Sequence, residues 1–382
     1  MAGETNSPVL DSLLQAFSEV PDPRVERTKF HPLVNVLTMA LFGAICGADG
    51  WEALELFAKE RVKFFRTFLT MRKGTPSADT FRRVFEALAP TAFQDAFRRW
   101  LKPFLDNLEG QTIALDGKTL RGALAHAAGH GGAFHLMHVW ATEQRLLLAQ
   151  QAVEGAPGEI HAAEELLKLL DLKGATVTTD ANSCTAGFSG AVSEAGAFYV
   201  LALKGNRGAL LRHVQKLFAD AEAGGFRGVK RHESKNRGHG RDECRIVRAL
   251  SITSLPESIA KTWTNLKTAV MVDRIRLDKN LSVERSYYVT SHSPDAKLLA
   301  AKIRAHWKIE NQLHHCLDVS FAEDRRSIHD ENGAQNFALI TRYALSMLER
   351  EPTKMSVAMK RRKAAWGETY LLDVLSSGFT QV

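Results

Sequence analysis

Apolar residues recur every three or four positions through the first 108 residues, which is the spacing of one face of an amphipathic helix. The clearest segments are residues 9–17, 33–44 and 51–57. Prolines and glycines separate these segments, and Ser77 is a suitable N-cap for a further helix over about residues 78–88. Residues 1–108 are therefore predicted to form an all-helical N-terminal domain.

Basic residues lie on two consecutive predicted helices of this domain, before and after Pro90. They are Arg82 and Arg83 on the first helix, and Arg98 and Arg99 on the second. Two short helices of this kind are compatible with a helix-turn-helix, in which Arg82 and Arg83 would contact DNA. They are equally compatible with two ordinary amphipathic helices whose arginines are solvated. The sequence leaves both interpretations open.

The hydrophobic period changes at Gly110 to the pattern of β-strands. Three β-rich runs predict an antiparallel meander, and a helix, a strand, a helix and a strand follow. By analogy of element order this is an α/β fold with an RNase H-like core, which places carboxylates at the end of its first strand, after its fourth, and on a later helix. The predicted strands are residues 111–120, 134–142, 146–154, 175–179 and 198–203, and the predicted helices are residues 160–172 and 184–195.

The stretch from Lys204 to Pro294 is β-like and basic, and we interpret it as an insertion into the core. Its candidate strands are residues 244–252, 268–277 and 284–290. Helical periodicity resumes at Ala296 and leads to a basic tail that contains Lys360 to Lys363. The predicted division is a helical domain over 1–108, a first core part over 109–206, a β-rich insertion over 207–294, core helices over 295–350 and a basic tail over 351–382.

Composition excludes several classes of protein. With 45% apolar and 24% charged residues, the chain is neither a disordered segment nor a collagen. Its four cysteines form no C-x-x-C pair, which argues against a disulfide framework and predicts a reducing cytoplasm. The longest apolar run, residues 33–48, is interrupted by Asn35 and Thr38 and is shorter than the ~20 residues of a membrane span. A net charge of +7 favours an anionic partner.

Three acidic residues occupy the positions that such a core reserves for carboxylates: Asp116, Asp180 and Glu310. Each lies in an apolar setting, where an unpaired charge is costly unless it binds a metal. Two divalent cations would neutralise the three carboxylates and hold the attacking and leaving oxygens of a phosphoryl transfer. The predicted chemistry is phosphodiester cleavage or exchange. Taken singly, each residue has another explanation, such as a turn at Asp116.

Six segments carry a resemblance to a known family. Over nearly the whole chain, the sequence resembles the bacterial insertion-sequence transposases of the ISAs type, which include the H-repeat-associated proteins. The segments are Pro-Asp-Pro-Arg (21–24), Pro-Ser-Ala-Asp-Thr-Phe-Arg-Arg-Val-Phe (76–85), Asp-Gly-Lys-Thr-Leu-Arg-Gly (116–122), Val-Leu-Ala-Leu-Lys-Gly-Asn (200–206), Gly-His-Gly-Arg (238–241) and His-Trp-Lys-Ile-Glu-Asn-Gln-Leu-His-His-Cys-Leu-Asp-Val (306–319).

This resemblance implies membership of the DDE superfamily, with Asp116, Asp180 and Glu310 as the catalytic and metal-binding triad. It implies two Mg²⁺ ions, for which Mn²⁺ can substitute, and cleavage and strand transfer at the ends of an insertion sequence. The expected partner is double-stranded DNA, as terminal inverted repeats and as target, bound by a homodimer. We expect a bacterial cytoplasmic protein associated with the nucleoid, and no membrane partner.

The chain departs from related transposases around the glutamate. A Tyr-Arg-Glu-Lys signature in those relatives has its Arg four residues before the Glu and its Lys seven after, where this chain has His306 and Leu317. The phosphate contacts of that Arg and Lys therefore do not carry over. After Asp180, the run Ala-Asn-Ser-Cys-Thr also differs from the expected Ala-Met-Gly-Cys-Gln.

Histidines offer two alternative metal sites. His306, Glu310 and His314 recur every fourth residue, so a regular helix would present them as a transition-metal ligand set. His306 is otherwise a candidate DNA contact. A second group consists of His126, His130, His135 and His138. These four histidines are compatible with a zinc site, or with a surface loop and a strand that bind no metal.

The segment from Arg227 to Arg245 holds seven basic residues and several glycines, which predicts a mobile cationic loop on the DNA backbone. A solvated hairpin is the alternative. Together with Lys118 in the first motif, the candidate contacts here are Arg231, Lys235, Arg237 and Arg241. The function predicted overall is that of a DNA transposase. The alternatives are a nuclease that only hydrolyses DNA, and a transposase-derived protein that binds DNA or a partner without cutting.

Overall fold

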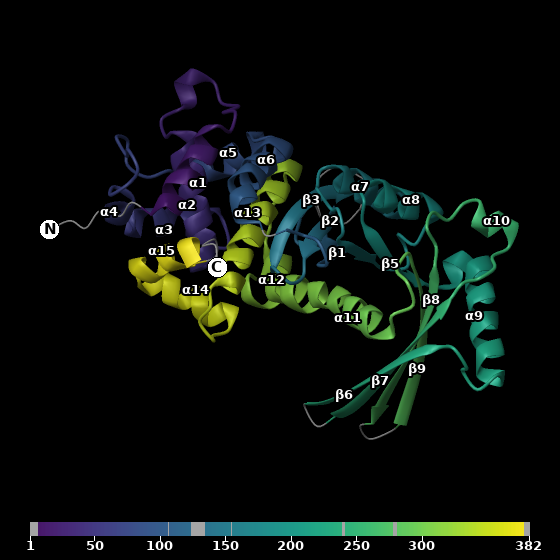
Figure 1. The fold of residues 1–382 in the computed structure, drawn as a ribbon. Coiled ribbons are helices and arrows are strands. Elements are labelled where there is room, and N and C mark those ends of the chain that lie inside the picture. Colours follow the sequence, from purple (N-terminus) through teal and green to yellow (C-terminus); the bar gives the residue numbers. More distant parts are fainter. Residues whose placement is uncertain are drawn as a thin grey trace.

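The computed structural model contains one nine-stranded sheet with helices on its faces and a helical body at one end (Figure 1). It describes residues 7–105, 107–123, 134–153, 155–238, 241–277 and 281–377. The strand order is β3-β2-β1-β4-β5-β9-β8-β7-β6, with both parallel and antiparallel pairs. The prediction of a mixed α/β fold with helices at the N-terminus is confirmed.

The first five strands occur in the predicted order. The strands β1 (Thr112–Leu120), β2 (Phe134–Ala141) and β3 (Leu146–Val153) form an antiparallel meander. Two crossovers then place β4 (Thr176–Thr179) parallel to β1, and β5 (Phe198–Leu203) parallel to β4. The crossover helices are α7 (Gly155–Lys168) and α8 (Ala186–Glu194). Helices cover both faces of these strands, which explains why Ile113, Ala114 and Leu115 are all fully buried.

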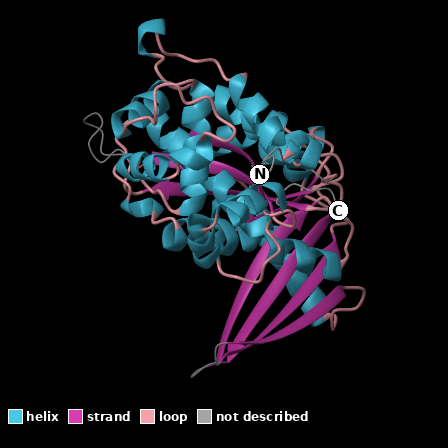
Figure 2. Cartoon of the chain, turned by 90° about the vertical axis from the view of Figure 1, so that its left-hand side faces the viewer, coloured by secondary structure: helices cyan, strands magenta, loops and turns pink. Residues whose placement is uncertain are grey.

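The predicted insertion continues the same sheet. β9 (Leu281–Thr290) pairs antiparallel with β5, and β8 (Thr268–Leu277), β7 (Arg241–Ser251) and β6 (Lys230–Gly238) follow in turn. These long strands project from the helical body as a ribbon (Figure 2). The prediction of a mobile loop over 227–245 was wrong, because β6 and β7 pair residue by residue from Lys230 with Ala249 to Gly238 with Arg241. The segment is a β-hairpin, and its contact with DNA stays a prediction.

The N-terminal helices surround α2, whose residues are nearly all buried. Their bounds are α1 (Pro8–Ser18), α2 (Leu33–Cys46), α3 (Trp51–Glu60), α4 (Val62–Phe65), α5 (Ala78–Ala87) and α6 (Pro90–Leu101). The side chain of Ser77 accepts a hydrogen bond from the Thr80 amide, as expected of an N-cap. Among the described residues, no single helix has the length and apolar content to cross a bilayer; α2 and α3 meet both criteria only as a pair bent by 97°.

The helix α13 (Glu331–Arg350) joins the sheet to the N-terminal helices, because it contacts β3 as well as α2, α5 and α6. The other helices after the ribbon are α11 (Ala296–His306), α12 (His315–Ser320), α14 (Val357–Trp366) and α15 (Glu368–Ser377). Helix α9 (Gly208–Ala223) precedes the ribbon, and α10 (Glu257–Ala260) lies between β7 and β8. One hydrophobic core runs from α1 through the sheet to α15. The N-terminal helices therefore share their core with the rest of the chain.

The predicted basic tail is folded as far as Ser377. It forms α14 and α15, which lie against α2 and α1 (Figure 1). Lys360 and Arg361 are only 5% exposed. Arg361 lies 2.6 Å from the Asp49 carboxylate and donates to the Ala44 carbonyl. These two basic residues therefore hold helices together and are not available to an external partner.

Candidate active site

Asp116 and Asp180 come to the same place because their strands are parallel neighbours. In the register of β1 and β4, Leu115 is paired with Thr179. Asp116 is the next residue on β1, and Asp180 directly follows β4. The Asp180 charge is close enough to raise the pKa of Asp116. The structure thus brings together the first two predicted carboxylates, as the parallel arrangement requires.

Glu310 reaches the same site from a deformed helix. The chain leaves α11 at His306 and forms a π-helix over Ile309–His314 before α12 begins. Such wide turns often occur at functional sites. His314 is buried, and its Nδ1 lies 3.2 Å from Glu310 Oε2 and 3.6 Å from Asp116 Oδ2. Potential ligand atoms of Asp116, Glu310 and His314 all lie within 4.8 Å of one another.

The electrostatics of the site favour a bound cation. Burial raises the pKa of Asp116 to about 6; the nearby His314 opposes this shift, and the charges of Asp180 and Glu310 add to it. The hydrogen bond with His314 lowers the pKa of Glu310. A partly buried carboxylate that is repelled by two others is stabilised in its ionised form by a hard cation. Most of the potential ligand atoms at this site are carboxylate oxygens.

His306 does not join this group. Its Nδ1 lies 3.1 Å from the Thr178 hydroxyl of β4, and burial lowers its pKa to about 4 against the opposing charge of Asp180. The predicted face of His306, Glu310 and His314 is therefore wrong for His306. His306 is the last residue of α11 and is hydrogen-bonded to β4, whereas Glu310 and His314 both lie on the π-helix that follows.

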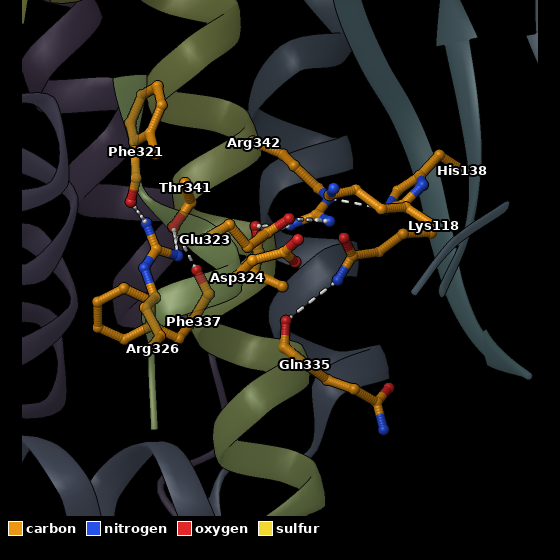
Figure 3. A network of polar contacts seen from close by, with 12 residues as sticks. Lys118, His138, Phe321, Glu323, Asp324, Arg326, Gln335, Phe337, Thr341 and Arg342 are labelled. Atoms are coloured by element: carbon orange, nitrogen blue, oxygen red, sulfur yellow. Dashed lines mark hydrogen bonds and ion pairs between the residues drawn. The ribbon is translucent and has the colours of Figure 1, made fainter. Parts of the chain in front are cut away.

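A buried polar network joins β2 to α13 and to Glu323 (Figure 3). Arg342, on α13, is fully buried; its Nε lies 2.7 Å from His138 Nε2, and its guanidinium also contacts Glu323 at 2.6 and 3.2 Å. His138 is the β2 residue directly opposite Asp116. Burial, together with the Arg342 charge, holds the pKa of His138 well below its usual value.

Sequence reasoning missed the role of this network. Its one available signal was Arg342, a charged residue within the apolar periodicity of the helix from 333 to 350. His135 and His138 are three residues apart on β2 and meet different partners: His135 contacts Glu159 of α7 at 3.0 Å, and His138 contacts Arg342 of α13. These two histidines do not share a zinc site. His126 and His130 lie outside the described residues.

Close packing explains one residue of the Asp-Gly-Lys motif. A Cβ atom at Gly117 would lie 2.1 Å from His135 Nε2, so the His135 ring covers the backbone directly after Asp116. A larger residue at position 117 would displace the His135 ring, so glycine is the residue that fits this close approach.

Comparison with known families identifies the chain. Residues 107–347 match the family described as Transposase DDE domain, and residues 14–101 match the family described as DDE_Tnp_1-associated. The chain belongs to the DDE transposase family. The predicted resemblance and the predicted transposase function are confirmed. DDE transposases generally use divalent metals, and the acidic and histidine cluster of this transposase offers ligands for one.

Two relatives from Escherichia coli match almost the full chain. "Putative transposase YncI" of strain O157:H7 is 33% identical over 96% of this chain and 95% of its own length. "H repeat-associated putative transposase YhhI" of strain K12 is 31% identical over 96% of this chain and 98% of its own length. Among solved structures, a piggyBac transposase synaptic complex with hairpin DNA aligns at 12% identity and a TM-score of 0.42, over 98% of this chain and 79% of that one.

The predicted DNA contacts of this transposase are mostly ion-paired. Lys118, on β1, lies 2.6 Å from Asp318, and only 9% of its side chain is exposed. Arg82 and Arg83 both pair with Asp79 of their own helix. On the ribbon, Arg231 and Lys235 pair with Glu233, and Arg237 pairs with Asp242. The Arg241 side chain lies outside the described residues. The DNA contacts stay predictions.

Proposed function

We propose that this transposase cleaves DNA at the ends of an insertion sequence and transfers the freed strand to a target, with two Mg²⁺ ions held by Asp116, Asp180 and Glu310. The observation that carries the proposal is that Glu310, on the π-helix, and Asp180, after β4, both approach Asp116: Glu310 belongs to the same ligand group as Asp116, and the Asp180 charge raises the pKa of Asp116. The strand order β3-β2-β1-β4-β5 supports an RNase H-like core around them.

The residues present fit hard divalent cations. Three carboxylates supply oxygen ligands, and the raised pKa of Asp116, at about 6, reflects burial and unrelieved repulsion that a cation would relieve. When bound, two such ions polarise the phosphate and stabilise the attacking and leaving oxygens. His314 donates to the Glu310 carboxylate and orients it. Mn²⁺ accepts the same oxygen ligands and is expected to substitute.

Two successive displacements at phosphorus make up the proposed reaction. In the first, a water attacks the phosphodiester at the element end; the 3′ oxygen leaves and becomes a 3′-hydroxyl. In the second, this hydroxyl attacks a phosphodiester of the target, so one bond forms as another breaks. The three carboxylates would hold the cations that keep the reacting phosphate in line, and such positioning is where most catalysis of phosphoryl transfer arises.

Double-stranded DNA is the proposed partner, and a homodimer that holds two element ends is the proposed assembly. Support for DNA comes from the net charge of +7 and from the basic residues on the exposed ribbon. His306, hydrogen-bonded to Thr178 beside Asp180, is placed to orient groups at the site as a neutral ring.

The decisive experiment is a cleavage and strand-transfer assay. A plasmid would carry the inverted repeats that flank the chain's own gene, and Mg²⁺ would be added. We expect nicks at the element ends for the unaltered chain, and loss of cleavage but not of DNA binding for Asp116→Asn, Asp180→Asn and Glu310→Gln. Glu257→Gln, an exposed carboxylate paired with Lys261, is the charge-matched control.

Each result of this assay separates the candidates. Cleavage at the ends without strand transfer would indicate a nuclease, and DNA binding with no cleavage would indicate a transposase-derived binding protein. One relative, "Inactive transposase YbfQ" of E. coli K12, matches 20% of this chain. Near-normal cleavage by any one triad variant would remove that residue from the site.

A further inference from the structure

Two buried imidazoles lie behind the proposed metal site, each with one unused nitrogen. The rings of His138 and His314 have centroids 5.7 Å apart and cross at 62°. His138 is fully buried and His314 is 5% exposed. Within the described part of the chain, His138 Nδ1 and His314 Nε2 have no hydrogen-bond partner. A buried unpaired nitrogen is costly, so the pair invites an explanation.

Arg342 determines which nitrogen of His138 carries the proton. A guanidinium only donates, and Arg342 Nε lies 2.7 Å from His138 Nε2, so Nε2 must accept. The Glu323 carboxylate holds both terminal nitrogens of the guanidinium, which prevents it from turning away. His138 is therefore neutral with its hydrogen on Nδ1. The unused nitrogen of His138 is a donor.

The same reasoning applies to His314 from its other side. Its Nδ1 lies 3.2 Å from Glu310 Oε2 and 3.6 Å from Asp116 Oδ2, and carboxylate oxygens accept. With a hydrogen on Nδ1, neutral His314 has a free electron pair on Nε2. The unused nitrogen of His314 is then an acceptor, the complement of the donor left on His138.

We propose that His138 is a positioning residue for the proposed metal site. Its Nδ1–H donates to His314 Nε2, directly after a small shift or through one buried water, and so keeps the His314 hydrogen on Nδ1. His314 then acts by holding the Glu310 carboxylate through a hydrogen bond beside Asp116, and its Nδ1 is not a metal ligand. The chain of contacts runs Glu323, Arg342, His138, His314 and then the carboxylates.

The inference rests on the proposed function in one respect, the presence of a metal at the carboxylates. Its consequence is chemical selectivity, because a site of oxygen ligands alone suits Mg²⁺ and Mn²⁺, whereas an imidazole ligand would favour Zn²⁺. Groups that orient metal ligands commonly change metal affinity 10- to 100-fold when they are removed.

Two amide substitutions separate the two hydrogen bonds of His138. In His138→Gln, the amide lies near the position of Nε2 and can accept from Arg342, but no donor remains towards His314. In His138→Asn, the amide lies near the position of Nδ1 and can donate to His314, but the Arg342 contact is lost. His161→Gln, at an exposed histidine on α7, is the control. Mn²⁺ affinity, measured by electron paramagnetic resonance, and the melting temperature are the readouts.

We expect Mn²⁺ to bind about tenfold or more weakly to His138→Gln than to the unaltered chain. His138→Asn should bind Mn²⁺ within about threefold of the unaltered chain and yet melt at a lower temperature, because Arg342 loses its acceptor. Equal losses of affinity in both variants, in proportion to lost stability, would show a purely structural role and overturn the proposal.

A direct measurement covers the case in which a variant does not fold. In metal-free chain labelled with ¹⁵N-histidine, the ring shifts should show the hydrogen on Nδ1 for both His138 and His314. A hydrogen on Nε2 of either ring overturns the proposal. If the unaltered chain binds no Mn²⁺ while both rings show Nδ1–H, the proposed metal site fails and the assignment of His138 stands.

Discussion

The Lys118 ammonium lies 2.6 Å from the Asp318 carboxylate, which ties β1 to α12 across 200 residues of sequence. Lys118 is two residues after Asp116, and its charge helps to lower the pKa of Glu310. In this arrangement, without DNA, Lys118 is ion-paired with Asp318. Its predicted contact with a phosphate therefore depends on how easily that ion pair opens.

Breaking the pair from either side tests Lys118 as a DNA contact. Asp318→Asn should release Lys118 and raise DNA affinity severalfold, whereas Lys118→Met should lower it, both without regard to sequence. Asp318→Asn should also lower the free energy of unfolding, because the Lys118 side chain is only 9% exposed and loses its ion-pair partner. Fluorescence anisotropy on end and random duplexes measures both. Equal affinity in the two variants would remove Lys118 from the interface.

The raised pKa of Asp116 predicts a pH-dependent stability in metal-free chain. Folded Asp116 keeps its proton up to about pH 6, against a usual value of 3.8, so stability falls as pH rises between these values and is constant above. The shift of about 2 units corresponds to roughly 3 kcal/mol at most. Asp116→Asn should therefore gain stability relative to the unaltered chain from pH 4 to 6, as measured by chemical denaturation.

A bound divalent cation should reverse the fall in stability that the metal-free chain shows as pH rises. Protons and cations compete for Asp116, so Mg²⁺ or Mn²⁺ should raise the melting temperature clearly at pH 8 and little at pH 5. The Asp116→Asn chain should show neither response. A stability difference between the two chains that does not change from pH 4 to 8 would contradict the assignment.

The ribbon predicts a salt-dependent, sequence-independent share of DNA binding. Replacing the four predicted contacts on β6 and β7 by Ala should weaken binding to all duplexes alike and flatten the slope of log affinity against log salt by about 0.9 for each lost phosphate contact. These residues are Arg231, Lys235, Arg237 and Arg241. A control removes four ion-paired lysines that lie elsewhere: Lys29, Lys59, Lys168 and Lys261. An unchanged slope would identify the ribbon as a solvated hairpin.

Substitution of the two α5 arginines tests whether they contact DNA bases, DNA phosphates or no DNA. Arg82 contacts Asp79 and Glu86 at 2.7 and 2.9 Å, so binding a base requires exchange of these partners. If α5 reads the element end, Arg82→Ala with Arg83→Ala in the full chain should cost about tenfold or more in preference for end over random duplex. An equal loss on both duplexes would mean phosphate contact, and no loss would mean solvated ion pairs.

The sequence by itself determined most of the elements and singled out three carboxylates as the predicted triad. Short β-rich runs after Gly110 predicted β1 to β5, and the three- and four-residue period predicted the helices, because both patterns are local in the sequence. Asp116, Asp180 and Glu310 stood out because a charge in an apolar setting is costly anywhere in a sequence.

Only the tertiary structure decided what these residues meet. The register of β1 with β4 places Asp180 beside Asp116, and the π-helix turns His314, and not His306, towards the carboxylates. The basic run at 227–245 pairs as β6 and β7, and Arg361 binds Asp49. Arg342, His138 and Glu323 are 19 to 204 residues apart along the chain, and their hydrogen bonds exist only once α13 lies on the sheet. Local patterning carries no information on such contacts, because they depend on which elements pack together.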